Sequence, residues 1–581
     1  MRVLRDLIMG VDLGTSNSAV SVFEDGKARI IENSEGSRTT PSVVAFKGDQ
    51  VLVGSVAQRQ ASQNAKDTFF ATKRLIGRRF EDPLVSVYDS QTPFSVVKSE
   101  HGDAHLKRTN NDVVSPVEVG AHVLQHLKER VEAVMNEKVT QAIITCPSYF
   151  DESQRQATKN AGEIAGLEVL RTLNEPTAAA LAYGIKSKDV DQIIAVFDLG
   201  GGTFDVTLLR LTPNNVYEVV ATHGNTFLGG EDFTKIITDI VLERCDKSLA
   251  DAIRASPSSI ARLAEACEAA KISLSQSSSA VVSVPFISFV DGEPRHVECT
   301  VSRSEFEARS SVLVDTFKKC CKQTMSDAGL SVQEVDEVLL VGGQTRMPLV
   351  REAVEAFFRQ KPSLAVNPDE VVAEGAAIQA GILSGEVSDV LLLDVAPLTL
   401  GIEIQGGRMG TIIARNSKVP CTSSQSFTTV EDNQTQVTVR VLQGESVFSG
   451  QNSLLGEFQL CDIPAMPKGM AQIEVTFSID ASGFVHVSAK DKFSGASKSI
   501  KVKSSGGMSR SEIDALTQKL ESREDTISRL LGDLSIIEKM NLDTKQQENV
   551  EKMRSALNSN AIPNLSEIEK ELVNLTASLV L

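Results

Sequence analysis

The sequence contains no long uninterrupted apolar run, so it lacks the simplest form of membrane anchor. No window comes near the roughly 18 consecutive apolar residues that a bilayer-spanning helix needs. The segment before the first apolar run, Met1–Asp6, carries two arginines and is too short for an ordinary secretory signal. These two absences predict a soluble protein with no membrane span.

Basic residues are also in short supply. The formal net charge is −17 at pH 7, so surfaces that carry phosphate would be repelled over most of the molecule. We expect neither nucleic acid nor an anionic membrane among the partners. The charge is interpreted as favouring solubility.

Cysteines in metal-binding pairs are missing as well. The eight cysteines show none of the close spacings of zinc sites, and most stand in apolar surroundings, which favours a reducing compartment. Cys320 and Cys321 are adjacent, but neighbours on a helix point to different faces, so we predict that both pack in the interior rather than form a redox switch. The eight positions are Cys146, Cys245, Cys267, Cys299, Cys320, Cys321, Cys421 and Cys461.

The most informative feature that is present occurs twice. Asp12-Leu13-Gly14-Thr15 returns, expanded, as the run from Asp198 to Thr203, and each copy follows an apolar strand-like run. Glycines let backbone N–H groups approach a phosphate, threonine adds a hydroxyl donor, and an aspartate at a strand end can hold magnesium directly or through water. One such turn is more often an ordinary turn. Two matched copies predict a duplicated nucleotide-binding fold.

Two further phrases place polar residues or glycines at the ends of apolar runs. Asn174-Glu175-Pro176-Thr177 puts a carboxylate at a helix start, where a helix cap is the simpler interpretation if the phrase stands alone. The run from Leu339 to Pro348 has the pattern of a strand, a glycine turn and a helix start. Its glycines would let an adenine or ribose approach the backbone.

The pattern along the chain divides its 581 residues into four parts. Up to about residue 386, strand-like runs alternate with helix-like stretches, which indicates a layered α/β domain. From 396 to 507 the alternation has period two, as at Val437, Val439 and Val441, which indicates the antiparallel hairpins of a β-sandwich. Between them, 387–395 holds a run of leucines. Such a run is usually a buried strand, but at a domain boundary we interpret it as a linker that docks and undocks.

The last part, 508–581, has helical periodicity. Ser509 and Glu512 have the spacing of a capping box, and apolar residues follow at helical spacing up to Ile537. Pro563 interrupts the pattern before one further short amphipathic stretch that ends near Leu579. We expect this apolar stripe to pack on its own helical neighbours rather than to form a partner site.

Taken together, these phrases resemble the seventy-kilodalton heat-shock protein family of chaperones. The resemblance runs from about Leu7 almost to the end of the chain. The blocks that carry it are Gly10–Ser18, Lys73–Arg78, Asn174–Gly184, Asp198–Asp205, Gly229–Phe233, Val341–Pro348, Val390–Ile402 and Glu431–Gln434.

The resemblance implies a fold of several domains. A duplicated, actin-like α/β ATPase domain (1–386) would be joined by a linker (387–395) to a β-sandwich that binds peptides (396–507), followed by a shortened helical lid (508–581). ATP or ADP and Mg²⁺ are the ligands implied. The lid is shorter than is typical of the family, so faster peptide exchange is expected.

The family's site residues match positions of this chain. Asp12, Glu175 and Asp198 would arrange Mg²⁺, mostly through its waters, and Lys73 would face the γ-phosphate and the attacking water. Glu175 and Asp205 remain alternatives for orienting or deprotonating that water, since phosphoryl transfer depends on positioning more than on a strong base. The implied phosphate contacts are Gly14, Thr15, Ser16, Asn17, Gly200, Gly201, Gly202 and Thr203. The implied adenosine contacts are Glu268, Lys271, Ser275, Gly342, Gly343, Arg346 and Asp369. For Lys271, structural pairing with a carboxylate is the alternative.

The second half also has matching positions. Those that line the family's groove for an extended apolar peptide are Ile402, Ile404, Phe427, Val437 and Val439; without the resemblance they would be interpreted as ordinary core. Gln405 and Val430 stand where family members often carry Met and Ala, or Ala and Tyr, in an arch over the peptide, which leaves the client preference open.

Coupling between the halves is implied by two further matches. Val390, Leu391, Leu392, Leu393 and Asp394 match the linker that docks on the ATPase domain in the ATP state. Pro147 and Arg155 match a proline switch and its arginine relay, with a simple strand end as the alternative for Pro147.

The implied partners are unfolded or extended client polypeptides, a J-domain co-chaperone and a nucleotide-exchange factor. Phe69–Lys73, Gly102–Ala104, Gly224–Gly230 and Ser504–Gly507 look most like the mitochondrial branch, itself similar to the bacterial one. A mitochondrial-type organelle is therefore favoured over a bacterial-type cytoplasm. The processes implied are protein import, folding, the stress response and iron–sulfur cluster assembly.

Two other functions compete with a cycling chaperone. A non-cycling holdase fits the altered arch and the short lid but leaves Lys73 and the matched carboxylates without a purpose. A small-molecule kinase on the same ATPase fold leaves the linker and the sandwich unexplained.

Overall fold

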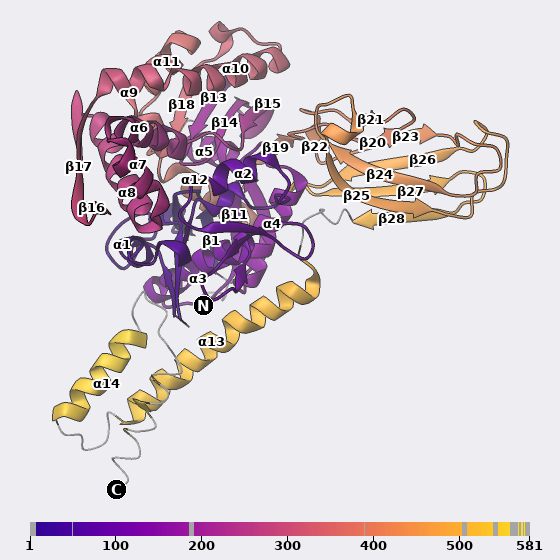
Figure 1. Ribbon diagram of the computed structural model, residues 1–581. Coiled ribbons are helices and arrows are strands. Elements are labelled where there is room, and N and C mark those ends of the chain that lie inside the picture. Colours follow the sequence, from indigo (N-terminus) through magenta and orange to yellow (C-terminus); the bar gives the residue numbers. More distant parts are fainter. Residues whose placement is uncertain are drawn as a thin grey trace.

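The computed structural model describes residues 7–48, 50–184, 191–388, 390–501, 508–537 and 544–557, together with positions 568, 571, 572 and 575. A large α/β body carries a β-sandwich that projects from one side, and a long helix runs beneath the body (Figure 1). We call the elements from Leu7 to Asn174 the first lobe and those from Gln192 to Phe358 the second lobe. The predicted sandwich end at 507, the break at Pro563 and the end of the last stretch at Leu579 lie outside the described residues. Ile568, Leu572 and Leu575 of that stretch are described, and all three are buried.

The first lobe is built on a mixed sheet in the order β12-β11-β1-β2-β3, with β4 also paired to β2. β1 is antiparallel to β2 and parallel to β11, and α3 and α4 pack against the sheet and each other. Two three-stranded sheets, β6-β5-β7 and β10-β9-β8, complete the lobe. Its elements are β1 (Leu7–Asp12), β2 (Asn17–Glu24), β3 (Lys27–Ile30), β4 (Thr40–Pro41), β5 (Val43–Lys47), β6 (Gln50–Val53), α1 (Ser55–Arg59), η1 (Ala65–Asp67), β7 (Thr68–Phe70), η2 (Thr72–Arg74), α2 (Pro83–Asp89), β8 (Ser95–Lys98), β9 (Ala104–Lys107), β10 (Val113–Val114), α3 (Pro116–Met135), β11 (Val139–Cys146), α4 (Glu152–Ile164) and β12 (Glu168–Asn174).

The second lobe repeats four strands of that sheet, with β18-β13-β14-β15 in the places of β11-β1-β2-β3. β13 is antiparallel to β14 and parallel to β18, and β15 takes the place that β3 has in the first lobe. The duplication predicted from the two glycine turns is therefore present in the strand order. The elements of the lobe are β13 (Gln192–Leu199), β14 (Phe204–Leu211), β15 (Val216–Asn225), α6 (Gly230–Arg244), α7 (Lys247–Ala255), α8 (Pro257–Leu274), β16 (Ser279–Val290), β17 (Glu293–Ser302), α9 (Arg303–Arg309), α10 (Ser311–Ala328), η3 (Val332–Glu334), β18 (Glu337–Val341), η4 (Gly343–Arg346) and α11 (Pro348–Phe358).

Two helices of small residues lie between the sheets. α5 (Glu175–Gly184) and α12 (Val371–Leu383) pack on each other, and α12 also packs on β1. A Cβ on Gly375 would lie 1.9 Å from the carbonyl oxygen of Ala178, and a Cβ on Gly10 would lie 2.2 Å from the backbone nitrogen of Ala377. The close approach therefore requires glycine at both positions, and it brings the two lobes together.

The linker forms a strand that two parts of the protein share. β19 (Leu391–Val395) pairs in parallel with β15 along Val216–Glu218, and its last residues pair with β22 (Lys418–Val419). Leu391 is 52% exposed, whereas Asp394 and Val395 are buried. The linker is docked on the second lobe, and the sandwich follows directly from it.

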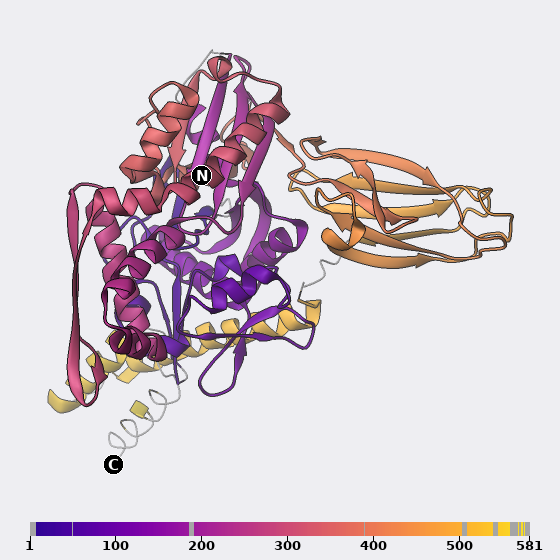
Figure 2. The same cartoon turned by 45° about the horizontal axis from the view of Figure 1, so that its top comes forward.

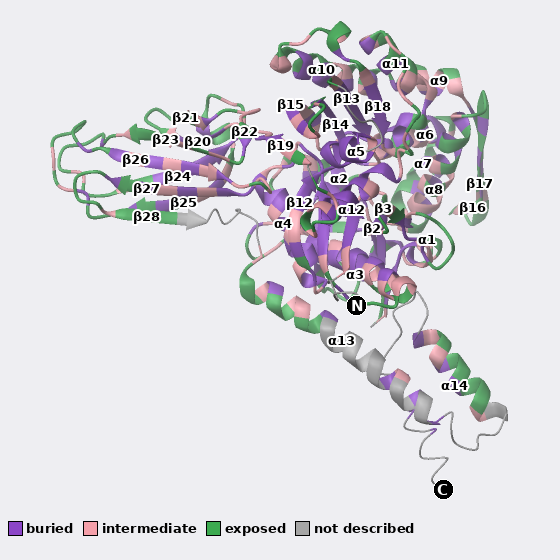
Figure 3. Ribbon diagram, turned by 180° about the vertical axis from the view of Figure 1, so that it is seen from behind, coloured by how far each residue is buried: buried purple, intermediate pink, exposed green. Residues whose placement is uncertain are grey.

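The sandwich consists of two antiparallel four-stranded sheets, β21-β20-β24-β25 and β23-β26-β27-β28. Inward apolar residues alternate with outward polar residues, and in β26 buried residues alternate with residues of intermediate exposure (Figure 3). The predicted hairpins at Val437 and Ile473 are confirmed. The elements are β20 (Leu400–Ile404), β21 (Arg408–Ile413), β23 (Cys421–Phe427), β24 (Val437–Gln443), η5 (Ser449–Gln451), β25 (Ser453–Leu460), β26 (Ile473–Ile479), β27 (Val485–Asp491) and β28 (Ser497–Lys501).

The C-terminal part contains the helices α13 (Arg510–Ile537) and α14 (Thr544–Leu557). The predicted capping box is confirmed, since the Glu512 N–H donates to Ser509 Oγ at 3.2 Å and the Ser509 N–H donates to Glu512 Oε2 at 2.6 Å. Among the described residues, no helix has the length and apolar character needed to cross a membrane.

We predicted that the apolar stripe of α13 packs on its own helical neighbours. This prediction is wrong for the first half of the helix. Ile513 and Leu520 are buried in the core of the first lobe, and α13 packs along α4. Only the second half, including Leu530 and Leu534, packs with α14 as predicted. In Figure 2 the yellow helix follows the first lobe rather than the sandwich.

Candidate functional site

The two glycine turns face each other across the junction of the lobes. A Cβ on Gly201 would lie 2.0 Å from Ser16 Oγ, and a Cβ on Gly202 would lie 2.4 Å from Thr15 Cγ2. The side chains of the first turn therefore occupy the space that the glycines of the second turn leave free. The structure brings together the predicted phosphate contacts of both turns.

A group of buried acidic side chains surrounds these turns, with one lysine among them. Lys73 Nζ donates to Glu175 Oε1 at 2.7 Å, and each side chain is 8% exposed. Burial and the charge of Glu175 raise the pKa of Asp12 to about 7 and that of Asp205 to about 7, and they raise the pKa of Asp198 well above its ordinary value. Burial by itself would lower the pKa of Lys73, but the nearby carboxylates hold it above the usual range. The site is rich in negative charge that the lysine only partly offsets.

The donor atoms at this position fit a hydrated magnesium ion. Asp205 Oδ2 accepts the Ser148 N–H at 2.9 Å, while Asp205 Oδ1 is buried and has no hydrogen-bond partner among the described residues. Within the described ranges no three His, Cys, Asp or Glu side chains are grouped closely enough to hold a metal directly. Mg²⁺ keeps several waters when it binds beside phosphates, so the arrangement fits binding through water and phosphate oxygens.

The predicted adenosine contacts lie on the second lobe, around the end of α8 and η4, except for Asp369, which precedes α12. Lys271 Nζ donates to the Gly230 carbonyl at 3.0 Å and pairs with Glu268 at 2.8 Å. The structural pairing considered for Lys271 is thus present. Arg346 pairs with Asp369 at 2.5 Å.

Three smaller members of this set lie beside these charged residues. Ser275 caps the end of α8 and is partly buried. Gly342 has φ 81°, and its Cβ would lie 2.4 Å from the Leu199 carbonyl, so a side chain is excluded there. Gly343 would place a Cβ 3.5 Å from Asp369 Oδ1. Gly343 and Arg346 therefore both lie beside Asp369.

The segment around Pro147 is held by Arg155. Pro147 directly follows β11, as the strand-end interpretation expects. The buried Arg155 guanidinium donates to the carbonyls of Ser148 at 2.9 Å and Phe150 at 3.2 Å, and it contacts Cys146 Sγ at 3.3 Å. Arg155 therefore fixes the turn that contains Pro147 and Ser148.

Hydrogen bonds continue from this turn to the sandwich. Ser148, whose N–H binds Asp205, shares a 2.8 Å hydrogen bond between its hydroxyl and that of Thr222. The Thr222 N–H donates to Asn416 Oδ1 at 3.2 Å, and Asn416 in turn contacts Asp327. No motif in the sequence pointed to Ser148, Thr222 or Asn416, because small polar residues near strand ends are common in all proteins.

A second connection joins the linker to the acidic group. Asn174 Nδ2 donates to Asp394 Oδ2 at 2.8 Å, and the next residue, Glu175, binds Lys73. Asp394 lies in β19, so the docked linker is one residue away from the ion pair of the nucleotide site. The role implied for Asp394 in coupling stays a prediction.

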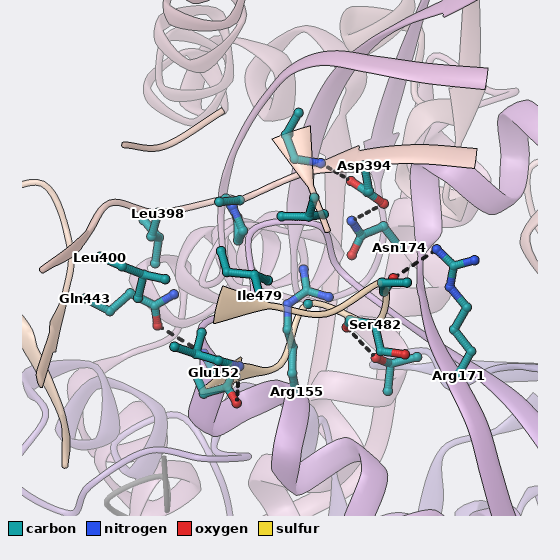
Figure 4. A pocket seen from close by; sticks show the side chains of 18 residues that line it. Glu152, Arg155, Arg171, Asn174, Asp394, Leu398, Leu400, Gln443, Ile479 and Ser482 are labelled. Carbon is teal, nitrogen blue, oxygen red and sulfur yellow. Dashed lines mark hydrogen bonds between the residues drawn. The ribbon is translucent and has the colours of Figure 1, made fainter. Parts of the chain in front are cut away.

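A pocket lies where the first lobe, the linker and the sandwich meet (Figure 4). Arg171 Nη2 donates to the Ala481 carbonyl at 3.0 Å, and Thr172 donates to the Ser482 carbonyl at 3.0 Å. Glu152 Oε1 accepts the Val485 N–H at 3.3 Å, and burial raises the pKa of Glu152 to about 8. The β26–β27 turn of the sandwich is therefore one of its attachments to the first lobe.

The predicted peptide positions divide into two groups. Ile402 and Val439 are buried in the sandwich core, as the ordinary-core interpretation expects, and Phe427 and Val437 are partly buried against it. The exposed positions are Ile404, Gln405 and Val430.

The sequence also matches a known protein family. The family model described as Hsp70 protein matches residues 8–579, nearly the whole chain. Members of this family are ATP-dependent chaperones that bind ATP or ADP with Mg²⁺, client polypeptides and co-chaperones. The two-lobed α/β body and the β-sandwich agree with that architecture. The chain belongs to the Hsp70 protein family.

Proposed function

We propose that this protein hydrolyses ATP between its two glycine turns and uses the reaction to control peptide binding in its β-sandwich. The observation that carries the proposal is the series of hydrogen bonds from Asp205 through Ser148 and Thr222 to Asn416. A change at the acidic group has a direct route to the sandwich through these contacts.

The residues of the site have distinct tasks in this proposal. The glycine backbone of the second turn and the hydroxyls of the first bind the phosphates, and Lys73 faces the transferred phosphoryl group. Mg²⁺, when bound, offsets the phosphate charge. Asp205 is better placed than Glu175 to orient the attacking water, because Asp205 Oδ1 has no partner among the described residues whereas Glu175 Oε1 accepts from Lys73. Its pKa of about 7 also suits a proton acceptor near neutral pH.

The described arrangement fits a docked state with an accessible sandwich. The linker strand is paired with β15, and α13 lies along the first lobe instead of over the sandwich. The exposed side chains of Ile404 and Val430 leave apolar surface for an extended peptide, which would gain affinity from backbone hydrogen bonds. We assign this arrangement to rapid peptide exchange, and the undocked one to retention.

A mitochondrial-type organelle is the proposed location, on the likeness of Phe69–Lys73 and Gly224–Gly230 to the mitochondrial branch. A J-domain co-chaperone and a nucleotide-exchange factor are the proposed partners, and import, folding and iron–sulfur cluster assembly are the proposed processes. Imaging of the tagged protein with an organelle marker tests the location; a diffuse cytoplasmic signal would contradict it.

Steady-state ATP hydrolysis, measured with and without an apolar peptide and a J-domain protein, tests the function. The proposal predicts that both additions accelerate hydrolysis, and that they do so together more than singly. Basal hydrolysis that ignores both would favour an uncoupled holdase. Absence of any hydrolysis by the folded protein would overturn the ATPase assignment itself.

A further inference from the structure

Arg74 follows Lys73 directly but reaches into the other lobe. Its side chain is 1% exposed. The guanidinium binds both carboxylate oxygens of Asp232, with Nη1 3.3 Å from Oδ1 and a shorter contact from Nη2 to Oδ2, and Nε donates to the Gly202 carbonyl at 3.2 Å. It also lies over the Phe227 ring, 4.3 Å from the centroid. Arg74 belongs to the first lobe, whereas all three of these partners belong to the second.

The receiving end of this contact is the N-terminus of α6. Asp232 Oδ2 also accepts the Gly229 N–H at 2.8 Å, as part of the helix cap. The Gly230 N–H donates to the Gly200 carbonyl at 2.9 Å, which ties the second turn to the same helix end. The Gly230 carbonyl accepts from Lys271, one of the predicted adenosine contacts. The second glycine turn, the N-terminus of α6 and Lys271 are therefore all connected to the position that Arg74 contacts.

Two weaker contacts cross between the lobes beside it. Ser16 Oγ donates to Glu231 Oε1 at 3.0 Å, and Arg78 Nη2 donates to Thr226 Oγ1 at 2.7 Å. Neither is an ion pair. A bidentate arginine–carboxylate pair is stronger and more directional than a neutral hydrogen bond, and lysine cannot reproduce its fork.

We propose that Arg74, Gly202, Phe227 and Asp232 form a clasp, the α6 clasp, that holds the lobes together around the bound nucleotide and sets the rate of nucleotide release. This inference rests on the proposed ATPase function. A nucleotide between the two turns leaves only when the lobes separate, and separation must break the pair. Arg74 is a positioning residue, since its contacts are to the second lobe rather than to the reacting atoms.

Release of a fluorescent ADP analogue from the full chain tests the clasp. Arg74→Gln and Asp232→Asn should each accelerate release by on the order of tenfold, equivalent to about 1.4 kcal/mol. The double variant should release no faster than the faster single variant, because both changes remove one interaction. Arg74→Lys keeps the charge and should give an intermediate rate. As a matched control, Arg79→Gln removes an exposed pair with Asp103 inside the first lobe and should leave release unchanged.

A second readout separates the clasp from a general structural role. Single-turnover hydrolysis of ATP already bound should change far less than release in Arg74→Lys, whereas loosened folding would depress both and the melting temperature together. Unchanged release in a folded Arg74→Lys or Arg74→Gln protein, or additive effects in the double variant, would overturn the inference alone. A wild-type protein that binds no nucleotide would overturn the proposed function, and the clasp with it.

Discussion

The two lobes share one sheet topology but differ in what their turns carry. The turn after β1 presents the side chains of Thr15 and Ser16, whereas the turn after β13 has glycines at the facing positions, Gly201 and Gly202. A symmetric pair would either collide or leave a gap. The comparison shows that the two copies differ where they meet: one turn contributes hydroxyl side chains, and the other contributes backbone without side chains.

The lobes also differ in what the rest of the chain attaches to them. The outer strand β15 of the second lobe pairs with the linker strand β19, whereas its counterpart β3 pairs only with β2 among the described residues. The first lobe instead receives α13, with Arg510 paired to Glu163 at 2.9 Å. A motion of one lobe against the other would therefore act on β19 and on α13 at the same time.

Lys73 exists on the first lobe only, and removing it should produce the largest effect. Lys73→Ala should lower the rate of hydrolysis by about 10²–10³, in the range seen when one group stabilising transition-state charge is lost. Nucleotide binding should be partly retained, because the turns remain. Single-turnover hydrolysis and a binding isotherm measure the two effects, with the exposed Lys66→Ala as the control. Near-normal hydrolysis in Lys73→Ala would refute its assignment.

The complementarity of the turns can be broken with one methyl group. Gly201→Ala places a Cβ on Ser16 Oγ, and overpacking of this kind costs about 1–3 kcal/mol, which would weaken nucleotide binding by about one to two decades. Gly450→Ala is the control, since its Cβ would meet no atom within 4 Å and the residue lies in the sandwich, outside the predicted nucleotide contacts. Isothermal titration with Mg-ADP distinguishes them. Equal affinities of the two variants would show that the turns do not meet as described.

The pairing of β19 with β15 can be disrupted without changing the acidic group or the glycine turns. Leu391→Asp combined with Leu392→Asp places charge beside the partly buried contact of Leu392 with the core between the sheets, so β19 should leave β15. Stimulation of hydrolysis by peptide should then disappear while basal hydrolysis persists. Leu383→Asp, at a similarly exposed position on α12, serves as the control. Full stimulation in the double variant would show that coupling does not need this strand.

The raised pKa values of the acidic group should make stability and nucleotide binding depend on pH, which is a smaller effect than those above. Burial first, and then neighbouring carboxylates, raise the pKa of Asp12 and of Asp205 to about 7 in the free protein, so the protonated forms are favoured by folding and stability falls as pH rises from about 4 through 7. A bound magnesium nucleotide favours the ionised forms. Binding should therefore release protons and strengthen several-fold between pH 6 and 8.

Calorimetry of Mg-ADP binding in buffers of different ionisation enthalpy counts those protons. Asp205→Asn should release fewer protons than the wild-type protein, because it removes one of the groups with a raised pKa. Proton uptake on binding of Mg-ADP at pH 7 would contradict the predicted release of protons.

Local sequence patterns were sufficient to predict much of the fold. Alternation predicted the hairpin from Ile473, the repeated turn predicted the duplicated sheets, and the Ser509 capping box appeared where expected. These features depend on residues close in sequence. The roles of the site residues, although the turns bring their positions together, stay predictions that the experiments above address.

The partners of those elements were beyond reach of the sequence. The spacing of Ile513 and Leu520 gives α13 an apolar face but does not say which surface covers it, and the first lobe does so here. In the sequence, Arg74 is one more basic residue after Lys73. Asp232 has the position of an ordinary residue at a helix start. Only the folded chain shows that the two meet across the lobes.

Coupling between the lobes and the sandwich is the central claim, and release of a fluorescent apolar peptide measures it most directly. The peptide is bound first without nucleotide, and ATP with Mg²⁺ is then added in a stopped-flow experiment. The account predicts that ATP accelerates release of the peptide, because docking of the linker and the sandwich favours the accessible state. A release rate that is the same with and without ATP, in a protein that binds both ligands, would contradict it.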